Sequence, residues 1–311
     1  MSTDQRRHAD TAQLLAHEVT TWPALVRRVP VPVRQVLRRA RRAGVVLSWA
    51  TLTVAALAML VPFIWMLGVA LRTPADLYAH PASLWPHQWG LAGVTAILRE
   101  LPFGRLVLNT FVFAGGTTLL LLWFDSMTAF ALARMRFRGR RAVFFIIIAT
   151  LMVPFQVTII PVFLTVFHLG WLNTYHGLII PRATSALGIF LLRQFFLAIP
   201  ADLDDAARID GANNWQVYRR IILPLSKPAL ASLFVIQFMA LWNDFLWPLV
   251  ITSQIEMRTL PAALTLFQSE AGVDHAALMA GAAISIAPLA IAFLLAQRFF
   301  VQGVAATGVK N

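Results

Sequence analysis

Long apolar stretches separated by short polar ones form the main pattern of this 311-residue chain. Several apolar runs exceed about 20 residues, the length of helix that crosses the hydrocarbon core of a bilayer. The pattern predicts six membrane-spanning helices, at residues 45–71, 106–133, 142–167, 176–198, 229–252 and 275–301. We therefore expect an all-α, multi-pass membrane protein whose residues 45–311 form one transmembrane domain.

Residues 1–44 form a basic arm before the first span, with nine arginines and with Pro23, Pro30 and Pro32. The first apolar run is too long for a signal peptide and begins behind this arm, so we expect it to be retained as a span. Residues 35–42 are interpreted either as a basic helix on the inner leaflet or as a topology anchor with no further role.

The distribution of basic residues predicts the orientation, because short loops rich in lysine and arginine stay in the cytoplasm. Residues 134–141 hold five arginines, and residues 199–228 hold four basic residues. The alternate loops are poorer: residues 72–105 hold three, residues 168–175 none and residues 253–274 only Arg258. We therefore expect both termini and the 199–228 loop to face the cytoplasm.

Composition agrees with a membrane protein. The chain is 59% hydrophobic, with a mean hydropathy of +0.69 and a net charge of +12. We attribute the positive charge to topology and to attraction to anionic membrane lipid, so no nucleic-acid partner is expected. The chain has no cysteine, which excludes disulfides, thiolate metal sites and a cysteine nucleophile.

Signatures of catalysis and metal binding are absent from the sequence. The seven histidines are scattered without paired-ligand spacing, and no nucleophile elbow is visible. Residues 303–310 superficially resemble a phosphate-binding loop, but Val309 occupies the lysine position. We therefore expect no catalytic residue, no metal site and no cofactor bound by this chain itself.

The polar segment at residues 199–230 lies between two apolar runs and predicts a short helix of its own. Pro200 ends the preceding helix, and three aspartates at positions 202, 204 and 205 place negative charge in the next first turn, where the helix dipole favours it. Gly211 then supplies a stop.

One stripe of this short helix carries residues at i, i+3, i+4 and i+7, namely Leu203, Ala206, Ala207 and Asp210. The small side chains at its centre allow another backbone to approach closely. A helix of about ten residues is marginally stable alone in water, so it needs a partner surface or the adjacent helices. The stripe therefore predicts a docking face, and the alternative is an ordinary surface helix.

The same segment resembles the cytoplasmic coupling loop of permease subunits of binding-protein-dependent ABC importers, whose pattern runs E-A-A, then D-G-A, then I-x-L-P. Here the pattern is carried by Asp205-Ala206-Ala207, Asp210-Gly211-Ala212 and Ile221-Ile222-Leu223-Pro224. Asp205 stands where glutamate is common, which keeps the charge on a shorter side chain.

The resemblance extends from about residue 45 to the C-terminus. Residues 152–156, 169–175 and 242–248 resemble segments of the carbohydrate-uptake branch of these permeases. The closing segment, residues 300–310, is similar to that of permeases resembling the second maltose-importer membrane subunit.

This resemblance implies the type I ABC importer transmembrane fold and a transport subunit, with no enzyme activity of its own, in the bacterial cytoplasmic (inner) membrane. The implied solute is a sugar or a related polyhydroxylated compound. The implied partners are a second homologous permease, two ATP-binding cassette ATPases that carry ATP and Mg, and an extracytoplasmic solute-binding protein. The residues implied in ATPase coupling are Leu203, Asp205, Ala206, Ala207, Asp210, Gly211 and Pro224.

Ionisable residues inside the predicted spans suggest a second site, because each costs about 2.5–3.5 kcal/mol at mid-bilayer. With a rise of about 1.5 Å per residue, Arg182 and Asp244 lie about 9 and 12 Å inside the outer boundary and can meet. We hypothesise that they border the translocation path together with Gln156 and Asn243. The alternative is a buried pair that only stabilises helix packing.

A further carboxylate, Asp125, is predicted about 12 Å from the inner boundary, nearer in depth to Arg193. Arg193 can also extend its side chain to the cytoplasm.

Other functions remain open from the sequence. Within the ABC family, the alternative solute is a glycerol-phosphate or a polyamine. A secondary transporter would need no ATPase, but paired inverted repeats and broken helices would be expected and are not evident in the sequence. A membrane scaffold would share the topology and lack a solute path.

Overall fold

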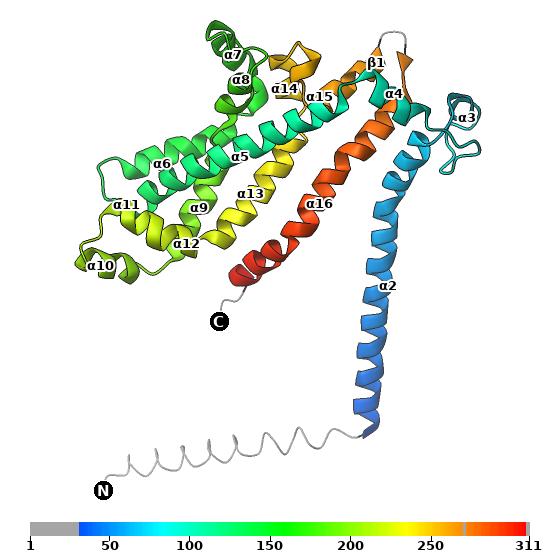
Figure 1. Cartoon of the computed structure of the whole chain (residues 1–311). Helices are drawn as coiled ribbons and strands as arrows, with labels where there is room; N and C mark the ends of the chain where they lie inside the picture. The colour runs from blue at the N-terminus through cyan, green and yellow to red at the C-terminus, as the bar shows by residue number, and fades with distance from the viewer. Residues whose placement is uncertain (1–30, 270–271, 309–311) are drawn as a thin grey trace. The chain divides into compact units, whose positions relative to one another are not determined.

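The structure, a computed structural model, describes residues 31–269 and 272–308 (Figure 1). The first described helix, α2, runs from Val31 to Ala70 and includes the first predicted span and residues 35–42 of the basic arm. The remainder of the arm, residues 1–30, lies outside the described residues, as does the end of the closing segment at residues 309–311.

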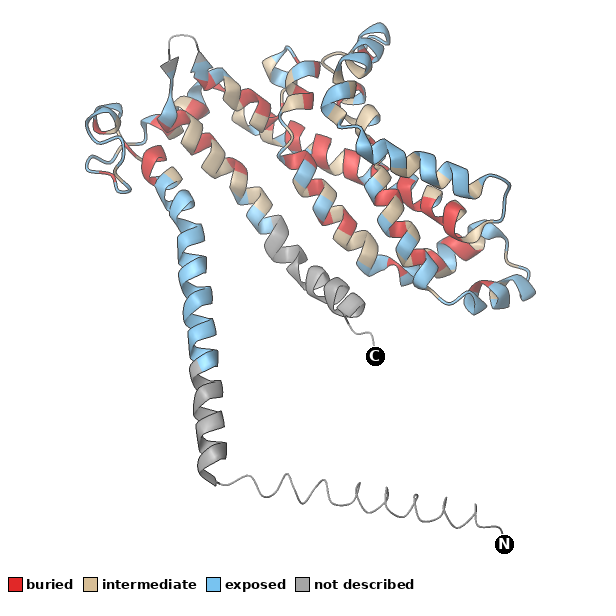
Figure 2. Cartoon of the chain, turned by 180° about the vertical axis from the view of Figure 1, so that it is seen from behind, coloured by how far each residue is buried: buried red, intermediate tan, exposed pale blue. Residues whose placement is uncertain are grey.

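Contacts divide the chain into two units within α2, between Phe63 and Ile64. In the first unit, the side chains of residues 44–63 are exposed on every side of the helix (Figure 2). Many of them are large and apolar, among them Leu47, Trp49 and Met59. A helix that is apolar all round requires lipid or other apolar surroundings.

The second unit is mostly helical (Figure 1). Its α-helices are α3 (Pro74–Ala79), α4 (Ala92–Glu100), α5 (Phe103–Arg134), α6 (Arg140–Ala149), α7 (Phe155–His168), α8 (Tyr175–Ile179), α9 (Ala186–Ala198), α10 (Asp202–Ile209), α11 (Asn214–Val217), α12 (Leu223–Leu225), α13 (Lys227–Trp242), α14 (Leu246–Ile251), α15 (Leu260–Ala263) and α16 (His275–Gly308). Short 3-10 turns are η1 (Thr150–Met152), η2 (Ile180–Arg182), η4 (Ile255–Met257) and η5 (Leu264–Phe267). A π-helical turn, η3, covers Tyr218–Ile222.

A small hairpin precedes α16 and was not predicted from the sequence. Strands β1 (Gln268–Ser269) and β2 (Gly272–Val273) pair antiparallel, with Gln268 opposite Val273 and Ser269 opposite Gly272. Two residues per strand leave no room for the alternation that signals a strand in a sequence.

The core of the second unit is built around α5, which packs against α9 and α13, while α16 packs against α13 and α4. One buried cluster joins the C-terminal half of α5 to α9, η3 and α13, and includes Phe130, Phe196 and Tyr218. A second joins the middle of α5 to α8, α13 and α14 around Trp242 and Trp247. A third joins α4, the start of α5, α15 and α16.

Three of the predicted spans are broken in the structure. In the 142–167 span, α6 and η1 meet α7 at a bend of 102°, next to Pro154. Proline has no backbone N–H and restricts the preceding residue, so the helix stops there. In the 176–198 span, α8 and η2 meet α9 at 47°, where Ser185 caps α9 by accepting a hydrogen bond from the Gly188 N–H.

The third break interrupts the 229–252 span, where α13 ends at Trp242 and α14 starts at Leu246. The Asp244 carboxylate accepts a hydrogen bond from the Trp247 backbone N–H at 3.3 Å, so a side chain satisfies a donor that the break leaves free.

Within the described residues, two helices are long and apolar enough to cross a membrane, Gly44–Ala70 and Phe103–Arg134. The number rises to five if each of three sharply bent pairs counts as one span. The first two pairs are the α6/α7 and α8/α9 breaks described above, and the third joins Asn214–Leu225 to Lys227–Trp242 at 75°. Within α16, His275–Ile291 forms a shorter apolar stretch. The six-span topology and the cytoplasmic placement of both termini therefore stay predictions.

Candidate functional site

The predicted loop helix is α10, and Gly211 ends it in the left-handed conformation at φ +82°. The Gly211 N–H donates to the Arg208 carbonyl at 3.0 Å, and the Ala212 N–H donates to the Ala207 carbonyl at 2.9 Å. These two bonds form the Schellman motif that closes a helix C-terminus. The sequence therefore fixes the end of α10 locally.

We expect Gly211→Ala to destabilise this helix end by about 1–2 kcal/mol, because a side chain disfavours the left-handed conformation. The effect is conformational, since a Cβ at Gly211 meets no atom within 4 Å. Gly139→Ala is the matched control, because Gly139 has the same φ of +82° and the same open surroundings outside this loop. Thermal unfolding should show similar losses, while only Gly211→Ala should weaken the binding of a partner that docks on α10.

The residues of the predicted stripe on α10 differ in how far they are buried. Leu203, Ala206 and Asp210 are exposed, whereas Ala207 is half-buried and packs against the cluster that contains Tyr218. The Asp205 side chain is 69% exposed and lies 3.8 Å from the Arg208 guanidinium. The exposed face of α10 therefore carries one large apolar side chain, one small one and two carboxylates. Such a face suits a partner with a complementary cleft.

Asp204 anchors α10 to the bundle, a role that the sequence analysis did not assign. Its carboxylate is buried and lies 3.5 Å from Nε of Arg134, at the C-terminal end of α5. The Arg134 Nη2 also donates to the carbonyl oxygens of Phe196 and Ile199, at 2.6 Å each. One guanidinium thus joins the ends of α5 and α9 to the start of α10.

A second connection from this loop to α5 runs through Tyr218. Its hydroxyl group shares a hydrogen bond of 2.8 Å with the Ser126 hydroxyl, and its ring packs on Phe130 with centroids 5.2 Å apart. Burial raises the pKa of Tyr218, so the hydroxyl stays protonated. Tyr218 begins the π-helical turn that leads to Pro224, whose missing N–H removes one α-helical hydrogen bond.

In the middle of the bundle, Arg182 and Asp244 form an ion pair with 3.1 Å between Nη2 and Oδ2. The Arg182 guanidinium also lies 3.9 Å from the centre of the Phe155 ring, in a cation–π contact. Arg182 comes from η2 and Asp244 from the break after α13, so two of the interrupted spans supply the pair.

A pocket of about 180 Å³ lies at Arg182 and is lined by both polar and apolar groups. Its polar lining comes from Arg182, Thr184, Ser185 and Gln237. The Gln237 amide donates to the Ser185 hydroxyl at 3.3 Å, which orders one wall. The pocket therefore places hydrogen-bond donors and acceptors beside the Phe155 ring.

Asp125 on α5 completes this region, although the sequence placed it nearer in depth to Arg193. Its carboxylate is fully buried and accepts hydrogen bonds from the Thr184 hydroxyl at 2.8 Å and the Ser185 N–H at 3.2 Å. Arg193 instead stacks on the Phe144 ring at 4.0 Å and donates to the Leu132 carbonyl at 3.3 Å. Asp125 therefore holds the loop that carries the pocket wall.

The other two predicted path residues lie apart from this pocket lining. Asn243 lines a separate pocket of about 500 Å³ formed with α15 and α16, and its amide donates to the Met239 carbonyl at 2.8 Å. Gln156 is exposed on the first turn of α7 and lines neither pocket. The structure brings together Arg182 and Asp244 but not all four residues.

More than half of the chain matches one known protein family. Residues 126–306 match the family described as binding-protein-dependent transport system inner membrane component. This range includes α10, the polar lining of the pocket beside Arg182 and most of α16.

Two curated relatives illustrate the similarity. The arabinooligosaccharides transport system permease protein of Bacillus subtilis (strain 168) is 38% identical over 209 residues, covering 67% of this chain and 73% of the relative. The sn-glycerol-3-phosphate transport system permease protein of Yersinia pestis bv. Antiqua (strain Antiqua) is 39% identical over 237 residues, covering 75% and 83%.

A solved structure supports the fold. A chain from a bacterial ABC transporter involved in the import of the acidic polysaccharide alginate superimposes with a TM-score of 0.72 and 27% identity. The match covers 84% of this chain and 98% of that chain.

Proposed function

Because this chain belongs to the family of binding-protein-dependent transport system inner membrane components, we propose that it is the membrane-spanning permease of an ATP-driven importer for a sugar or a related polyhydroxylated solute. The resemblance identified from the sequence is confirmed, and the chain has the type I ABC importer permease fold. It is a transport component rather than an enzyme. The observation that carries the proposal is the exposed face of α10, held on the bundle by Arg134 and Tyr218.

In the proposed assembly, the exposed face of α10 docks into a cleft of an ATPase subunit. Asp205 pairs there with a basic or amide group, and Leu203 and Ala206 supply the apolar contact. Two such ATPases bind ATP and Mg, and their closure pulls on α10. The Arg134 and Tyr218 contacts then transmit the movement to α5 and α9, which switch the bundle from inward to outward access.

The remaining partners follow from the same proposal. A second homologous permease covers apolar surface that this chain leaves exposed, and an extracytoplasmic solute-binding protein delivers the solute. The protein is placed in the bacterial cytoplasmic membrane as a multi-pass component, with both termini and α10 on the cytoplasmic side because of the arginine distribution.

The solute is proposed to pass the pocket beside Arg182. The Arg182–Asp244 pair carries no net charge, and the neighbouring hydroxyl and amide groups suit a neutral polyhydroxylated molecule. The second candidate is an anionic solute such as a glycerol-phosphate, which is favoured if Arg182 releases Asp244 and pairs with the solute instead. The similarity to a sn-glycerol-3-phosphate permease supports keeping this candidate.

The test is purification of the tagged chain from its native membrane in mild detergent, with mass spectrometry of the proteins that accompany it. We expect an ATPase, a second permease and a binding protein. A chain that stays alone after crosslinking would instead favour a secondary transporter or a scaffold. Broken helices were expected for a secondary transporter and were not evident in the sequence, but the structure contains them (Figure 1). Their presence therefore does not distinguish a secondary transporter from an ABC permease.

We expect Asp205→Lys to reduce solute uptake by at least about tenfold, equivalent to about 1.4 kcal/mol of docking free energy. The reason is that the side chain is exposed and positioned to meet a partner. Asp202→Lys is the matched control, because Asp202 is exposed in the same first turn and lies outside the Asp205-Ala206-Ala207 part of the coupling-loop pattern. Uptake into reconstituted vesicles measures both variants, and equal losses would contradict the docking role.

A further inference from the structure

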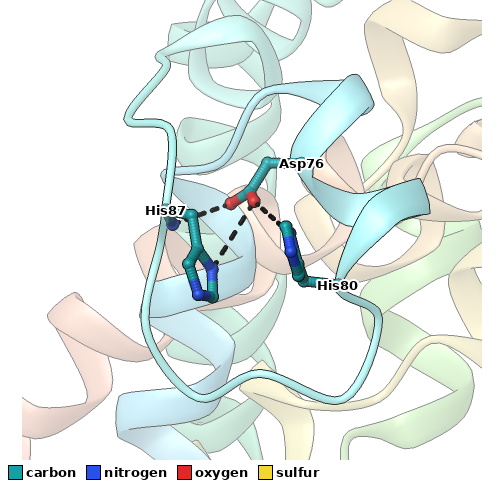
Figure 3. Close-up of side chains that lie close together, drawn as sticks. All are labelled: Asp76, His80 and His87. Atoms are coloured by element: carbon teal, nitrogen blue, oxygen red, sulfur yellow. Dashed lines mark hydrogen bonds and ion pairs between the residues drawn. The ribbon is translucent and has the colours of Figure 1, made fainter.

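A second polar cluster lies far along the chain from α10, in the segment between α2 and α4. Figure 3 shows Asp76 with His80 on one side and His87 on the other. Asp76 lies on α3, and His80 follows one helical turn later at the C-cap. His87 lies eleven residues after Asp76, where the loop turns back toward α3. All three belong to the second unit of the chain.

The distances within this cluster fit the edges of a metal coordination polyhedron. The Nδ1 atoms of His80 and His87 lie 3.1 and 3.7 Å from the same carboxylate oxygen, Oδ1 of Asp76. Ligands about 2.0–2.1 Å from a tetrahedral ion are about 3.3 Å from one another. The two measured distances lie within a few tenths of an ångström of that value, and all three ligand atoms lie within 4.8 Å of one another.

A hydrogen bond accounts for the contact of His80 with Asp76 but not for that of His87. The 3.7 Å separation at His87 is too long for a hydrogen bond, yet its Nδ1 faces the oxygen that His80 already contacts. The two rings stack with centroids 4.2 Å apart, so both imidazoles lie against the same carboxylate. A cation shared by Oδ1 and both Nδ1 atoms accounts for the two contacts together.

Neighbouring groups hold the carboxylate in position. The other oxygen of Asp76, Oδ2, accepts from the His87 backbone N–H at 3.0 Å and lies 3.6 Å from Nε of Arg72. This leaves Oδ1 toward the two rings. Such outer contacts orient metal ligands and raise affinity.

The loop that carries the histidines is also fixed before any ion binds. The fully buried Arg72 guanidinium donates to the carbonyl oxygens of His80, Ser83 and Trp85. Backbone bonds from Thr73 to Gln88 and from Gly90 to Leu71 close the base of the loop, at 3.3 and 3.0 Å. The three ligand atoms therefore need little ordering on binding.

The three side chains differ in their exposure to solvent. The Asp76 side chain is 1% exposed, while those of His80 and His87 are 50% and 54% exposed. An ion can enter from the open side, where water can take a fourth position. Two imidazoles and one carboxylate suit zinc and similar transition-metal ions, whereas Mg²⁺ and Ca²⁺ prefer oxygen ligands.

We propose that Asp76, His80 and His87 form a binding site for one divalent zinc-type ion in the loop between α2 and α4. This departs from the absence of metal sites expected from the sequence. The i, i+4 spacing of Asp76 and His80 was a local signal, but only the fold brings His87 to them. The site does not rest on the transport proposal.

The test uses the purified full chain with its affinity tag removed, stripped of metal and titrated with Co²⁺. Tetrahedral Co²⁺ gives visible absorption bands, and added Zn²⁺ should displace it. We expect one Co²⁺ per chain, and at least roughly tenfold weaker binding in both His80→Ala and His87→Ala. His168→Ala is the matched control, because His168 is exposed and lies on α7 away from the cluster.

Either of two results would overturn the proposal. The first is no saturable Co²⁺ binding by the wild-type chain. The second is unchanged binding in the double variant H80A/H87A. Both histidines are half exposed, so these variants should fold, and thermal unfolding without metal verifies it. Because the readout is metal binding, failure of the transport proposal leaves this test intact.

Discussion

Replacing Arg134 with methionine should uncouple ATP hydrolysis from solute uptake in the assembled importer. The substitution leaves the Asp204 carboxylate buried without its cation, which costs about 3 kcal/mol or more for a buried pair. It also removes the donor for the Phe196 and Ile199 carbonyl groups, so α10 loses its attachment to α5 and α9. ATPase activity and uptake measured on the same vesicles should show hydrolysis that no longer depends on solute.

Two further variants separate the loss of the contact from general damage. Arg138→Met removes an exposed arginine of the same loop and should leave coupling unchanged. The double variant R134M/D204N removes the stranded charge and should recover stability without recovering coupling, because the carbonyl groups still lack their donor. Wild-type coupling in Arg134→Met would exclude the anchoring role.

Neutralising the Arg182–Asp244 pair should strongly reduce solute uptake even where the protein remains stable. Arg182→Gln or Asp244→Asn alone leaves one charge without its partner in the bundle. Each should cost on the order of 2 kcal/mol, less than for a fully buried pair because the side chains are 24% and 15% exposed. The double variant R182Q/D244N removes both charges and should regain most of that stability.

The double variant therefore distinguishes a structural pair from one that borders the solute path. Thermal unfolding reports the packing role, and uptake of labelled sugar reports the transport role. We expect near-wild-type unfolding with uptake reduced at least about tenfold. Uptake that survives the double substitution would assign the pair to packing alone.

Features encoded locally could be predicted from the sequence. The end of α10 at Gly211 depends on one residue type that tolerates φ +82°, and its start depends on acids that the helix dipole favours. Helix-forming apolar runs were recognised in the same way. Their interruptions were recognised less well, since Ser185 and Asp244 become helix-end hydrogen-bond partners only in the fold.

Contacts between segments distant in the sequence required the structure. Asp204 and Asp205 are adjacent acids in one helical turn, but about 100° of rotation separates their side chains. One therefore meets Arg134 in the bundle, and the other faces solvent. Counting residues along the span likewise predicts a depth for Asp125 close to that of Arg193. In the structure, the position of Asp125 around the α5 axis instead brings its carboxylate to Thr184 and Ser185.

The sequence by itself determined that this chain is a helical membrane permease with an exposed loop helix, because apolar run length, arginine distribution and the coupling-loop pattern are all linear properties. The tertiary structure decided which polar groups act together: Arg134 with Asp204, Arg182 with Asp244, and Asp76 with two histidines. Those pairings depend on helix rotation and on where chain breaks fall. Neither is encoded in the spacing of residues along a single segment.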